Sequence, residues 1–166
     1  VGKNGMGKSS LLKTILSFLP AWDGEVRLDG RDVTRLAPFR KRALGLAYSP
    51  QEQALFQDLS VRDNLRLGLR DDHGFEASLS DVSGWFPVLT ERLSQRAGTL
   101  SGGEQKMLIV ARGLIAKPRL LLLDEVTEGL QPSVVDRLAE VLSAARRDRG
   151  TAMLVVEQHL SFVLGL

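Results

Sequence analysis

Four consecutive leucines at 120–123 run directly into Asp124 and Glu125. A short run that is apolar at every position, rather than at alternate positions, is typical of a strand buried on both faces in a parallel sheet. In open α/β sheets, ligands bind beyond the carboxyl ends of the strands, which is where these two acidic side chains stand. The run therefore predicts an α/β fold with a doubly wound parallel sheet and a functional site at the end of this strand.

Predicted helices and strands alternate along the rest of the chain. The spacing of apolar residues predicts helices over 9–19, 60–69, 86–93, 101–116 and 133–149, a further helix starting at 161, and strands over 44–48 and 152–156. The pair Asp29-Gly30 predicts a tight turn between two short strands, and the polar, glycine-containing stretch 70–84 predicts an irregular link. The alternation of helix and strand supports the doubly wound architecture.

Composition narrows the class of protein. The 166 residues include no cysteine, which excludes a disulfide scaffold and any cysteine-based zinc or iron–sulfur site. A net charge of +2 is too small to argue for nucleic acid, and we expect no nucleic-acid partner. The apolar stretches are short, so neither a transmembrane helix nor a signal peptide is predicted.

A glycine-rich segment opens the chain. Residues 2–9 fit the pattern GxxxxGK[ST], in which glycines let backbone N–H groups surround phosphate oxygens at the positive end of a helix. The Lys8 ammonium is expected to reach the β- and γ-phosphates of a nucleotide, and the Ser9 hydroxyl to bind Mg²⁺. The expected phosphate contacts come from Gly2, Asn4, Gly5, Gly7, Lys8, Ser9 and Ser10. Taken alone, the segment could also be a glycine-rich turn before a helix.

The acidic pair after the leucine strand complements this loop. Asp124 is expected to hold Mg²⁺ directly or through water, and Glu125 to act as the base that polarises an attacking water. A solvated strand exit is the alternative interpretation, and the phosphate-loop pattern upstream argues against it.

A third motif, Leu100-Ser101-Gly102-Gly103-Glu104, opens the helix predicted over 101–116. Ser101 and Glu104 have the spacing of a capping box, and the two glycines leave N–H groups uncovered at a positive helix end that suits an anion. The motif resembles the LSGGQ signature of ABC ATPases. In that family the anion is the γ-phosphate held by the opposing subunit, which implies nucleotide-binding roles for Ser101, Gly102 and Gly103. A well-capped helix without a ligand is the alternative.

The order of the motifs strengthens the resemblance to ABC ATPases. Gln51 follows the phosphate loop at about the distance of the family's Q-loop glutamine, and Gln158 follows Glu125 at about that of its switch residue. The resemblance implies a P-loop NTPase core of the RecA type with a mainly parallel sheet, an inserted small α-helical subdomain and a β-hairpin. It implies ATP and Mg²⁺ as cofactors, with metal contacts from Ser9, Gln51 and Asp124, and catalytic roles for Glu125, Gln158 and Lys8.

Two segments, 125–133 and 155–159, resemble ATPases of branched-chain amino-acid uptake systems, and urea importers share much of the pattern. The resemblance implies an ATP-hydrolysing importer subunit, peripheral at the cytoplasmic face of the inner (plasma) membrane. Its implied partners are a second ATPase subunit, identical or different, arranged head to tail, transmembrane permease subunits and, indirectly, a solute-binding protein. Phe56 and Leu59 could contribute to a permease contact, although packing in the subdomain core is the interpretation we favour.

Three positions depart from the family pattern. Val126 stands where the family usually has proline, and its presence is expected to loosen the turn after Glu125. Gln131 lacks the carboxylate that the family's D-loop places at the dimer interface. Gln158 occupies the position of the switch histidine, with His159 one place later; we favour Gln158 as the γ-phosphate sensor and expect His159 to face solvent.

The expected organisation is a single ABC ATPase domain over 1–166, truncated at both ends, because the strand before the phosphate loop and the adenine-stacking aromatic residue are missing. Residues 1–51 are expected to form the part of the core with the phosphate loop and Q-loop, about 52–99 the helical subdomain, and 100–166 the signature helix and the rest of the core. A soluble ABC ATPase that acts on ribosomes or DNA is the alternative function, although the second cassette or coiled-coil insertion typical of that class is not visible. A non-catalytic ATP-gated module is a third class, against which the pair Asp124-Glu125 argues.

Overall fold

The computed structural model describes residues 6–51 and 54–166. The strands are β1 (Arg27–Leu28), β2 (Arg31–Asp32), β3 (Leu46–Ser49), β4 (Leu120–Asp124) and β5 (Ala152–Val156). The helices are α1 (Lys8–Ile15), α2 (Pro38–Ala43), α3 (Val61–Arg66), α4 (Phe75–Trp85), α5 (Pro87–Glu91), α6 (Gly102–Leu114), α7 (Pro132–Arg149) and α8 (Leu160–Leu164), and a 3-10 turn spans Ala97–Thr99.

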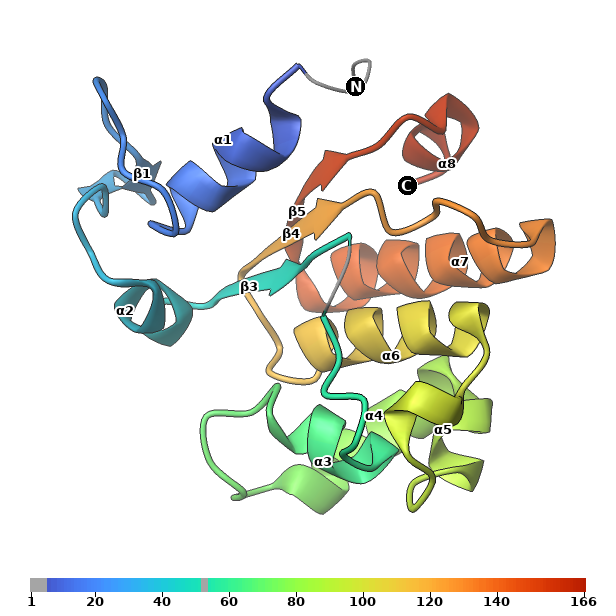
Figure 1. Ribbon diagram of the computed structural model, residues 1–166. Helices are drawn as coiled ribbons and strands as arrows, with labels where there is room; N and C mark the ends of the chain where they lie inside the picture. The colour runs from blue at the N-terminus through green and yellow to red at the C-terminus, as the bar shows by residue number, and fades with distance from the viewer. Residues whose placement is uncertain (1–5, 52–53) are drawn as a thin grey trace.

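Strand β4 is the centre of a parallel sheet with the order β3-β4-β5 (Figure 1). The register places Leu122 between Tyr48 of β3 and Leu154 of β5. Leu121 and Leu123 pack with α6 and α7, whereas Leu122 packs with α1 on the opposite face, and all three are fully buried. The run of leucines is apolar at every position because helices cover both faces of the sheet, as the sequence predicts.

Helices α6 and α7 follow the sequence prediction closely. Ser101 caps α6 in a capping box with Glu104, and Gly150 ends α7 in the left-handed conformation at φ 66°. Helix α6 lies so close to the sheet that a Cβ at Gly113 would stand 2.7 Å from the Ser49 hydroxyl oxygen. Glycine at this position therefore sets the distance between α6 and the sheet.

The β1–β2 hairpin also confirms its prediction. Its strands are antiparallel, with Leu28 paired to Arg31. Asp29 and Gly30 both have positive φ, 49° and 78°, which a two-residue type I′ turn requires. An ion pair between Asp29 and Arg119 ties the turn to the segment that leads into β4.

Helix α1 ends at Ile15, four residues before the predicted end at Leu19. Ser17 takes the left-handed conformation at φ 61°, and the N–H groups of Ser17 and Phe18 bond back to carbonyls of the last helical turn. Such an ending is usually built on glycine, so no local pattern at Ser17 predicts it. Fully buried Lys41 of α2 adds a second cap, since its ammonium donates to the Ile15 carbonyl at 2.6 Å.

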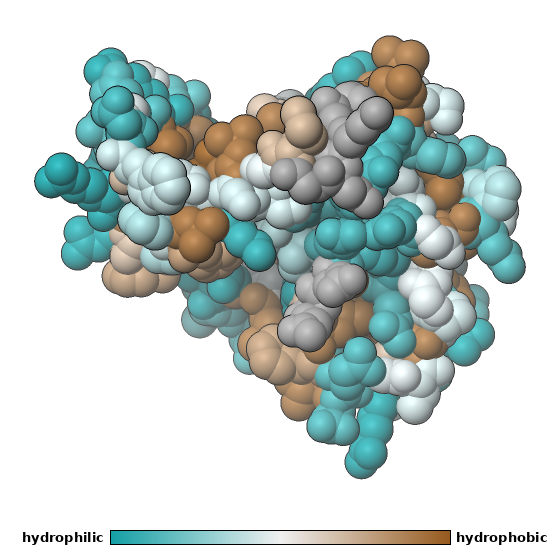
Figure 2. Space-filling model, turned by 45° about the horizontal axis from the view of Figure 1, so that its top comes forward, coloured by the Kyte–Doolittle hydropathy of each residue, from teal (hydrophilic) through white to brown (hydrophobic). Residues whose placement is uncertain are grey.

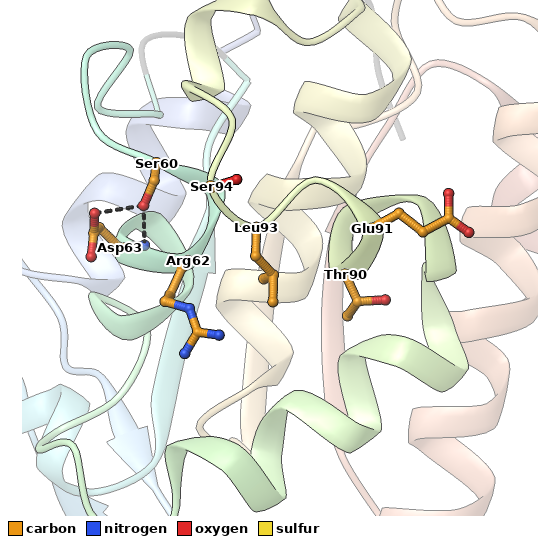
Figure 3. Close-up of a pocket in the computed structure, with 7 residues that line it drawn as sticks. All are labelled: Ser60, Arg62, Asp63, Thr90, Glu91, Leu93 and Ser94. Carbon is orange, nitrogen blue, oxygen red and sulfur yellow. Dashed lines mark hydrogen bonds between the residues drawn. The ribbon is translucent and has the colours of Figure 1, made fainter.

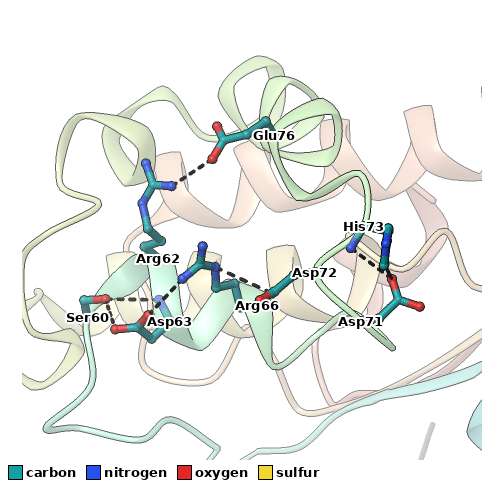
Figure 4. A network of polar contacts seen from close by, with 8 residues as sticks. All are labelled: Ser60, Arg62, Asp63, Arg66, Asp71, Asp72, His73 and Glu76. Atoms are coloured by element: carbon teal, nitrogen blue, oxygen red, sulfur yellow. Dashed lines mark hydrogen bonds and ion pairs between the residues drawn. The ribbon is translucent and has the colours of Figure 1, made fainter.

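The prediction of an irregular link over 70–84 is wrong, because most of that stretch belongs to α4. Phe75 and Val82 are buried on one face of the helix, and the polar residues between them hide this spacing. Figure 4 shows part of the polar network at the start of α4, where Arg62 of α3 forms an ion pair with Glu76 at 2.9 Å. Arg62 and Arg66 also lie over the Phe75 ring, with centroid distances of 5.6 and 5.1 Å.

Helices α3, α4 and α5 gather beside α6, away from the sheet (Figure 1). α3 ends at Arg66, and α5 is shorter than the helix predicted over 86–93. Phe56 and Leu59 are 58% and 38% exposed, so the favoured interpretation of core packing is wrong. Buried Asn64 instead binds the N–H and the C=O of Phe56, each at 3.0 Å, and so holds this loop against α3. The division of the chain into a core and a helical subdomain remains a prediction.

Apolar side chains reach the surface over α1 and α8 (Figure 2). Leu11 and Leu160 are each 56% exposed, and Leu164 is 84% exposed. None of the helices in the described ranges is long and apolar enough to span a membrane.

Candidate functional site

The phosphate loop is described from Met6 onward, and the predicted contacts Gly2, Asn4 and Gly5 lie outside the described residues. Gly7 is the N-cap of α1 with φ 80°, a left-handed conformation that glycine adopts at no steric cost. Lys8, Ser9 and Ser10 follow in the first turn of α1, where the helix dipole places partial positive charge. The described part of the loop therefore ends in a left-handed glycine at a helix N-terminus, an arrangement that suits an anion.

Asp124 ends β4 and is only 2% exposed. The Ser9 hydroxyl donates to its Oδ1 at 3.0 Å, and the Tyr48 hydroxyl donates to its Oδ2 at 3.1 Å. Two oxygens that bind adjacent positions of an octahedral Mg²⁺, with bonds of about 2.1 Å, lie about 3 Å apart, so Ser9 and Asp124 fit this ion. In residues 6–51 and 54–166 no three His, Cys, Asp or Glu side chains gather as a metal cage. A Mg²⁺ held here would therefore also use phosphate or water oxygens, as this ion commonly does.

Tyr48 is the only tyrosine of the chain, so its titration can be followed by absorbance. Burial, then the charge of Asp124 and the hydrogen bond to it, raise the pKa of the phenol well above its ordinary value of 10.0. We expect the folded protein to form no tyrosinate as the pH passes 10, whereas the chain unfolded in guanidinium ionises there. Because the folded pKa is the higher one, the stability linked to this group is complete below the unfolded pKa and is lost as the pH rises through the folded pKa. Ionisation of folded Tyr48 at its ordinary pKa would contradict its contact with Asp124.

Three side chains of the site contact the carboxylate of Glu125. The residue is 5% exposed, and its carboxylate lies 3.4 Å from Lys8 Nζ and accepts hydrogen bonds from Gln51 Nε2 at 3.2 Å and Gln158 Nε2 at 3.1 Å. Its φ of 46° is a left-handed conformation that costs a residue with a side chain about 1–2 kcal/mol. Strained backbone of this kind clusters at functional sites, where the surrounding structure holds it. Segments from distant parts of the chain therefore converge on one strained, buried carboxylate.

Gln51 lies between two carboxylates. Its Nε2 donates to Glu128 at 2.5 Å as well as to Glu125, while Lys106 of α6 donates to its backbone carbonyl. The structure thus brings the Gln51 amide to the two glutamates rather than to Asp124. The assignment of Gln51 as a metal ligand stays a prediction.

The structure separates the two neighbouring candidates for the switch position. Gln158 follows β5 and turns its side chain to Glu125. His159 is exposed and stands at the N-cap of α8, as expected, and the ring of His73 is also exposed. Geometry therefore favours Gln158 over His159, and its role at the γ-phosphate stays a prediction.

The signature residues lie apart from the phosphate loop of the same chain. The backbone N–H and the hydroxyl of Ser101 both donate to Glu104 at 2.8 Å, and the backbone bond is the main reason that the pKa of Glu104 is lowered. Gly102 and Gly103 form the first turn of α6, which starts beside α5, whereas Lys8 opens α1 on the opposite face of the sheet (Figure 1). Within one chain, Ser101 and Lys8 therefore do not share a site.

Figure 3 shows a hollow in the helical region, and two of the polar side chains that line it have structural roles. Ser60 lines it and caps α3 by accepting the Asp63 N–H at 3.0 Å. Arg62, another lining residue, is engaged by Glu76. Ser60 and Arg62 are thus engaged within the fold, whereas the groups at the end of β4 converge on a buried carboxylate, which makes the end of β4 the candidate functional site.

Sequence reasoning missed Tyr48 and Glu157 and gave Glu128 no role of its own. Tyr48 contacts Asp124, and Glu157 is buried directly after β5, where it accepts the Thr127 N–H at 2.9 Å. Both residues lie at the carboxyl edge of the sheet. Tyr48 is the last residue of the strand predicted over 44–48, and Glu157 directly follows β5, so a polar residue at the carboxyl end of each parallel strand is the pattern that could have identified them.

The chain is similar in sequence to known proteins. A family model described as "ABC transporter" matches residues 1–128. The chain is 38% identical, over 168 aligned residues, to the high-affinity branched-chain amino acid transport ATP-binding protein BraG of Pseudomonas aeruginosa, covering 100% of this chain and 72% of that protein. It is 36% identical, over 166 aligned residues, to the probable branched-chain amino acid transport ATP-binding protein LivF of Archaeoglobus fulgidus, covering 99% and 70%.

Solved structures agree with the fold. A nucleotide-free ATP-binding cassette from an ABC transporter matches with a TM-score of 0.83 and 25% identity, over 98% of this chain and 70% of that one. The ADP conformation of an ATP-binding cassette matches equally well, with a TM-score of 0.83 and 25% identity over 99% of this chain and 70% of that one. These likenesses confirm the predicted P-loop α/β fold. The chain therefore belongs to the ABC transporter family, as one of its ATPase domains.

Proposed function

We propose that this chain is the ATP-hydrolysing subunit of an importer for branched-chain amino acids or a related amide or amino-acid solute. The observation that carries the enzymatic part is the convergence of Lys8, Gln51 and Gln158 on Glu125, beside the Ser9–Asp124 pair. A cation, a magnesium site and a carboxylate that can activate water are the parts that phosphoryl transfer to water requires.

Each group in the cluster has a proposed task. Ser9 and Asp124 hold Mg²⁺, which when bound offsets negative charge on the phosphates. When ATP binds, the Lys8 ammonium leaves its ion pair with Glu125 and pairs with the β- and γ-phosphates, because a triphosphate carries more negative charge than one carboxylate. Glu125, released from its cation, accepts a proton from the attacking water. The Gln158 amide, now bonded to Glu125, can donate to the γ-phosphate.

A head-to-tail dimer follows from the separation of Ser101 from Lys8. The start of α6 carries two glycines, Gly102 and Gly103, whose N–H groups suit an anion. The described part of the phosphate loop, from Met6 onward, leads into α1 on the opposite face of the sheet from this helix end. We infer that each nucleotide is bound by the phosphate loop of one subunit and by the signature residues of another.

The transport role rests on the relatives and on the surface. Both relatives described above are named as branched-chain amino acid transport ATP-binding proteins. Phe56 and Leu59 are exposed in the loop before α3, which Asn64 holds through the Phe56 backbone, and they offer an apolar contact for a permease. As part of such an importer, the subunit would lie at the cytoplasmic face of the inner (plasma) membrane and would be linked to a solute-binding protein indirectly, through the permease.

Uptake of radiolabelled leucine by the source organism tests the transport role. We expect deletion of the gene to lower leucine uptake, the wild-type gene to restore it, and Lys8→Ala to fail because ATP binding is impaired. Excess unlabelled isoleucine and valine should compete with the label. Unchanged leucine uptake after deletion would exclude leucine, and loss of uptake of another amino acid or amide would then identify the solute. Unchanged uptake of every amino acid and amide tested would contradict the proposed solute class.

A further inference from the structure

Glu157 is a buried carboxylate that has no task in the proposed Mg²⁺ binding or in the proposed hydrolytic step. It follows β5 directly, next to the end of β4, where Val156 pairs with Asp124. The residue is 2% exposed. Its Oε1 accepts the Thr127 N–H at 2.9 Å, and its Oε2 accepts the Gln158 N–H at 3.3 Å. Both carboxylate oxygens therefore bind backbone N–H groups of the site's own loops.

The first of these loops carries Glu125 in a strained conformation. A φ of 46° in a residue with a side chain persists only where neighbouring contacts over-determine it. The Glu125 N–H donates to the Val156 carbonyl at 2.8 Å, Val126 is fully buried, and Glu157 holds the Thr127 N–H. The turn expected to be loose at Val126 is thus pinned on both sides of that residue.

The second loop carries Gln158, whose side chain meets Glu125 at 3.1 Å. Because one carboxylate holds the backbone of both loops, it fixes the distance between the Glu125 carboxylate and the Gln158 amide. We propose that Glu157 is a positioning residue for ATP hydrolysis, which keeps Glu125 and Gln158 aligned without touching the nucleotide. The inference rests on the proposed roles of Glu125 and Gln158.

The test measures steady-state ATP hydrolysis by the full chain carrying Glu157→Gln or Glu157→Ala. We expect kcat to fall about 10- to 100-fold in Glu157→Ala, the size of effect that a small misplacement of reacting groups produces, with KM for ATP changed less than about 3-fold. Glu157→Gln keeps the shape and one acceptor oxygen for Thr127, so its kcat should lie between wild type and Glu157→Ala. Hydrogen exchange at the Thr127 amide should accelerate in the same order.

Thr151→Val is the matched control, because Thr151 is another buried polar residue, 2% exposed, at the opposite end of β5. Its hydroxyl donates to the Pro118 carbonyl at 3.1 Å, far from the site, so its loss should lower the melting temperature but leave kcat unchanged. If Glu157→Ala keeps wild-type kcat, or if kcat falls equally in Thr151→Val, the positioning role is overturned.

A double substitution separates this inference from the proposed function. Once Glu125 is replaced by Gln, adding Glu157→Ala should lower the residual turnover little further, because the two residues act through the same group. Full turnover in Glu125→Gln alone would overturn the proposed function. Loss of turnover in Glu125→Gln together with normal turnover in Glu157→Ala would overturn only the role of Glu157.

Discussion

Glu125→Gln is expected to bind ATP but to lose turnover about 10²- to 10⁴-fold, the usual contribution of a general base. The amide has the size of the carboxylate and can still accept hydrogen bonds from Gln51 and Gln158, but it cannot take a proton from water. ATP affinity should be at least that of wild type, because Lys8 loses its ion-pair partner and one negative charge leaves the phosphate site.

The measurements for this variant are phosphate release at saturating ATP and equilibrium binding of ATP. Glu91→Gln is the control, since Glu91 is an exposed glutamate on α5 outside the cluster, and it should keep both values. Wild-type phosphate release by Glu125→Gln would reject Glu125 as the base.

Lys8→Ala is expected to weaken ATP binding about 10- to 100-fold. Hydrogen bonds to charged groups contribute about 1.5–3 kcal/mol, which is one to two decades of affinity. The Lys8 side chain is largely buried and paired with Glu125 at 3.4 Å, so it points into the site.

Calorimetric titration with ATP measures this effect. Lys13→Ala is the matched control, because Lys13 lies exposed in the last turn of the same helix and should bind ATP as wild type does. Equal affinities of the Lys8 and Lys13 variants would count against the assignment of the phosphate loop.

The sequence was most informative where local chemistry alone decides the structure. Leu120–Leu123 predicts a central strand because each of its positions must face a helix layer. Ser101 and Gly150 mark the ends of α6 and α7 because caps act through neighbouring backbone groups. The phosphate loop, Gln51, the signature motif, the acidic pair and Gln158, taken in order, identified the family that the comparisons confirm.

The sequence was misleading where tertiary contacts override local patterns. Ser17 ends α1 in a conformation that usually needs glycine. α4 lies in a stretch whose composition resembles a loop, and it forms because Phe75 and Val82 find a core to enter. Phe56 is apolar yet stays on the surface, since Asn64 holds its backbone there.

The candidate site was predictable as a set of residues but not as a geometry. Motif spacing selects Lys8, Gln51, Glu125 and Gln158, but their meeting at one carboxylate depends on how β3, β4, β5 and α1 are stacked. Glu157 lies in the segment 155–159 that marks the resemblance, but its residue type suggested no role, and only the fold brings its carboxylate to the Thr127 N–H. Long-range contacts of this kind cannot be read from local patterns.

The most direct test of the account is a single-turnover experiment, in which excess protein binds labelled ATP with Mg²⁺ and hydrolysis of the bound nucleotide is followed in time. For the same amount of ATP bound, we expect rapid hydrolysis by the full wild-type chain and a rate at least about 10²-fold slower in Glu125→Gln. Hydrolysis of bound ATP at the wild-type rate in Glu125→Gln would contradict the central claim that Glu125 activates the attacking water.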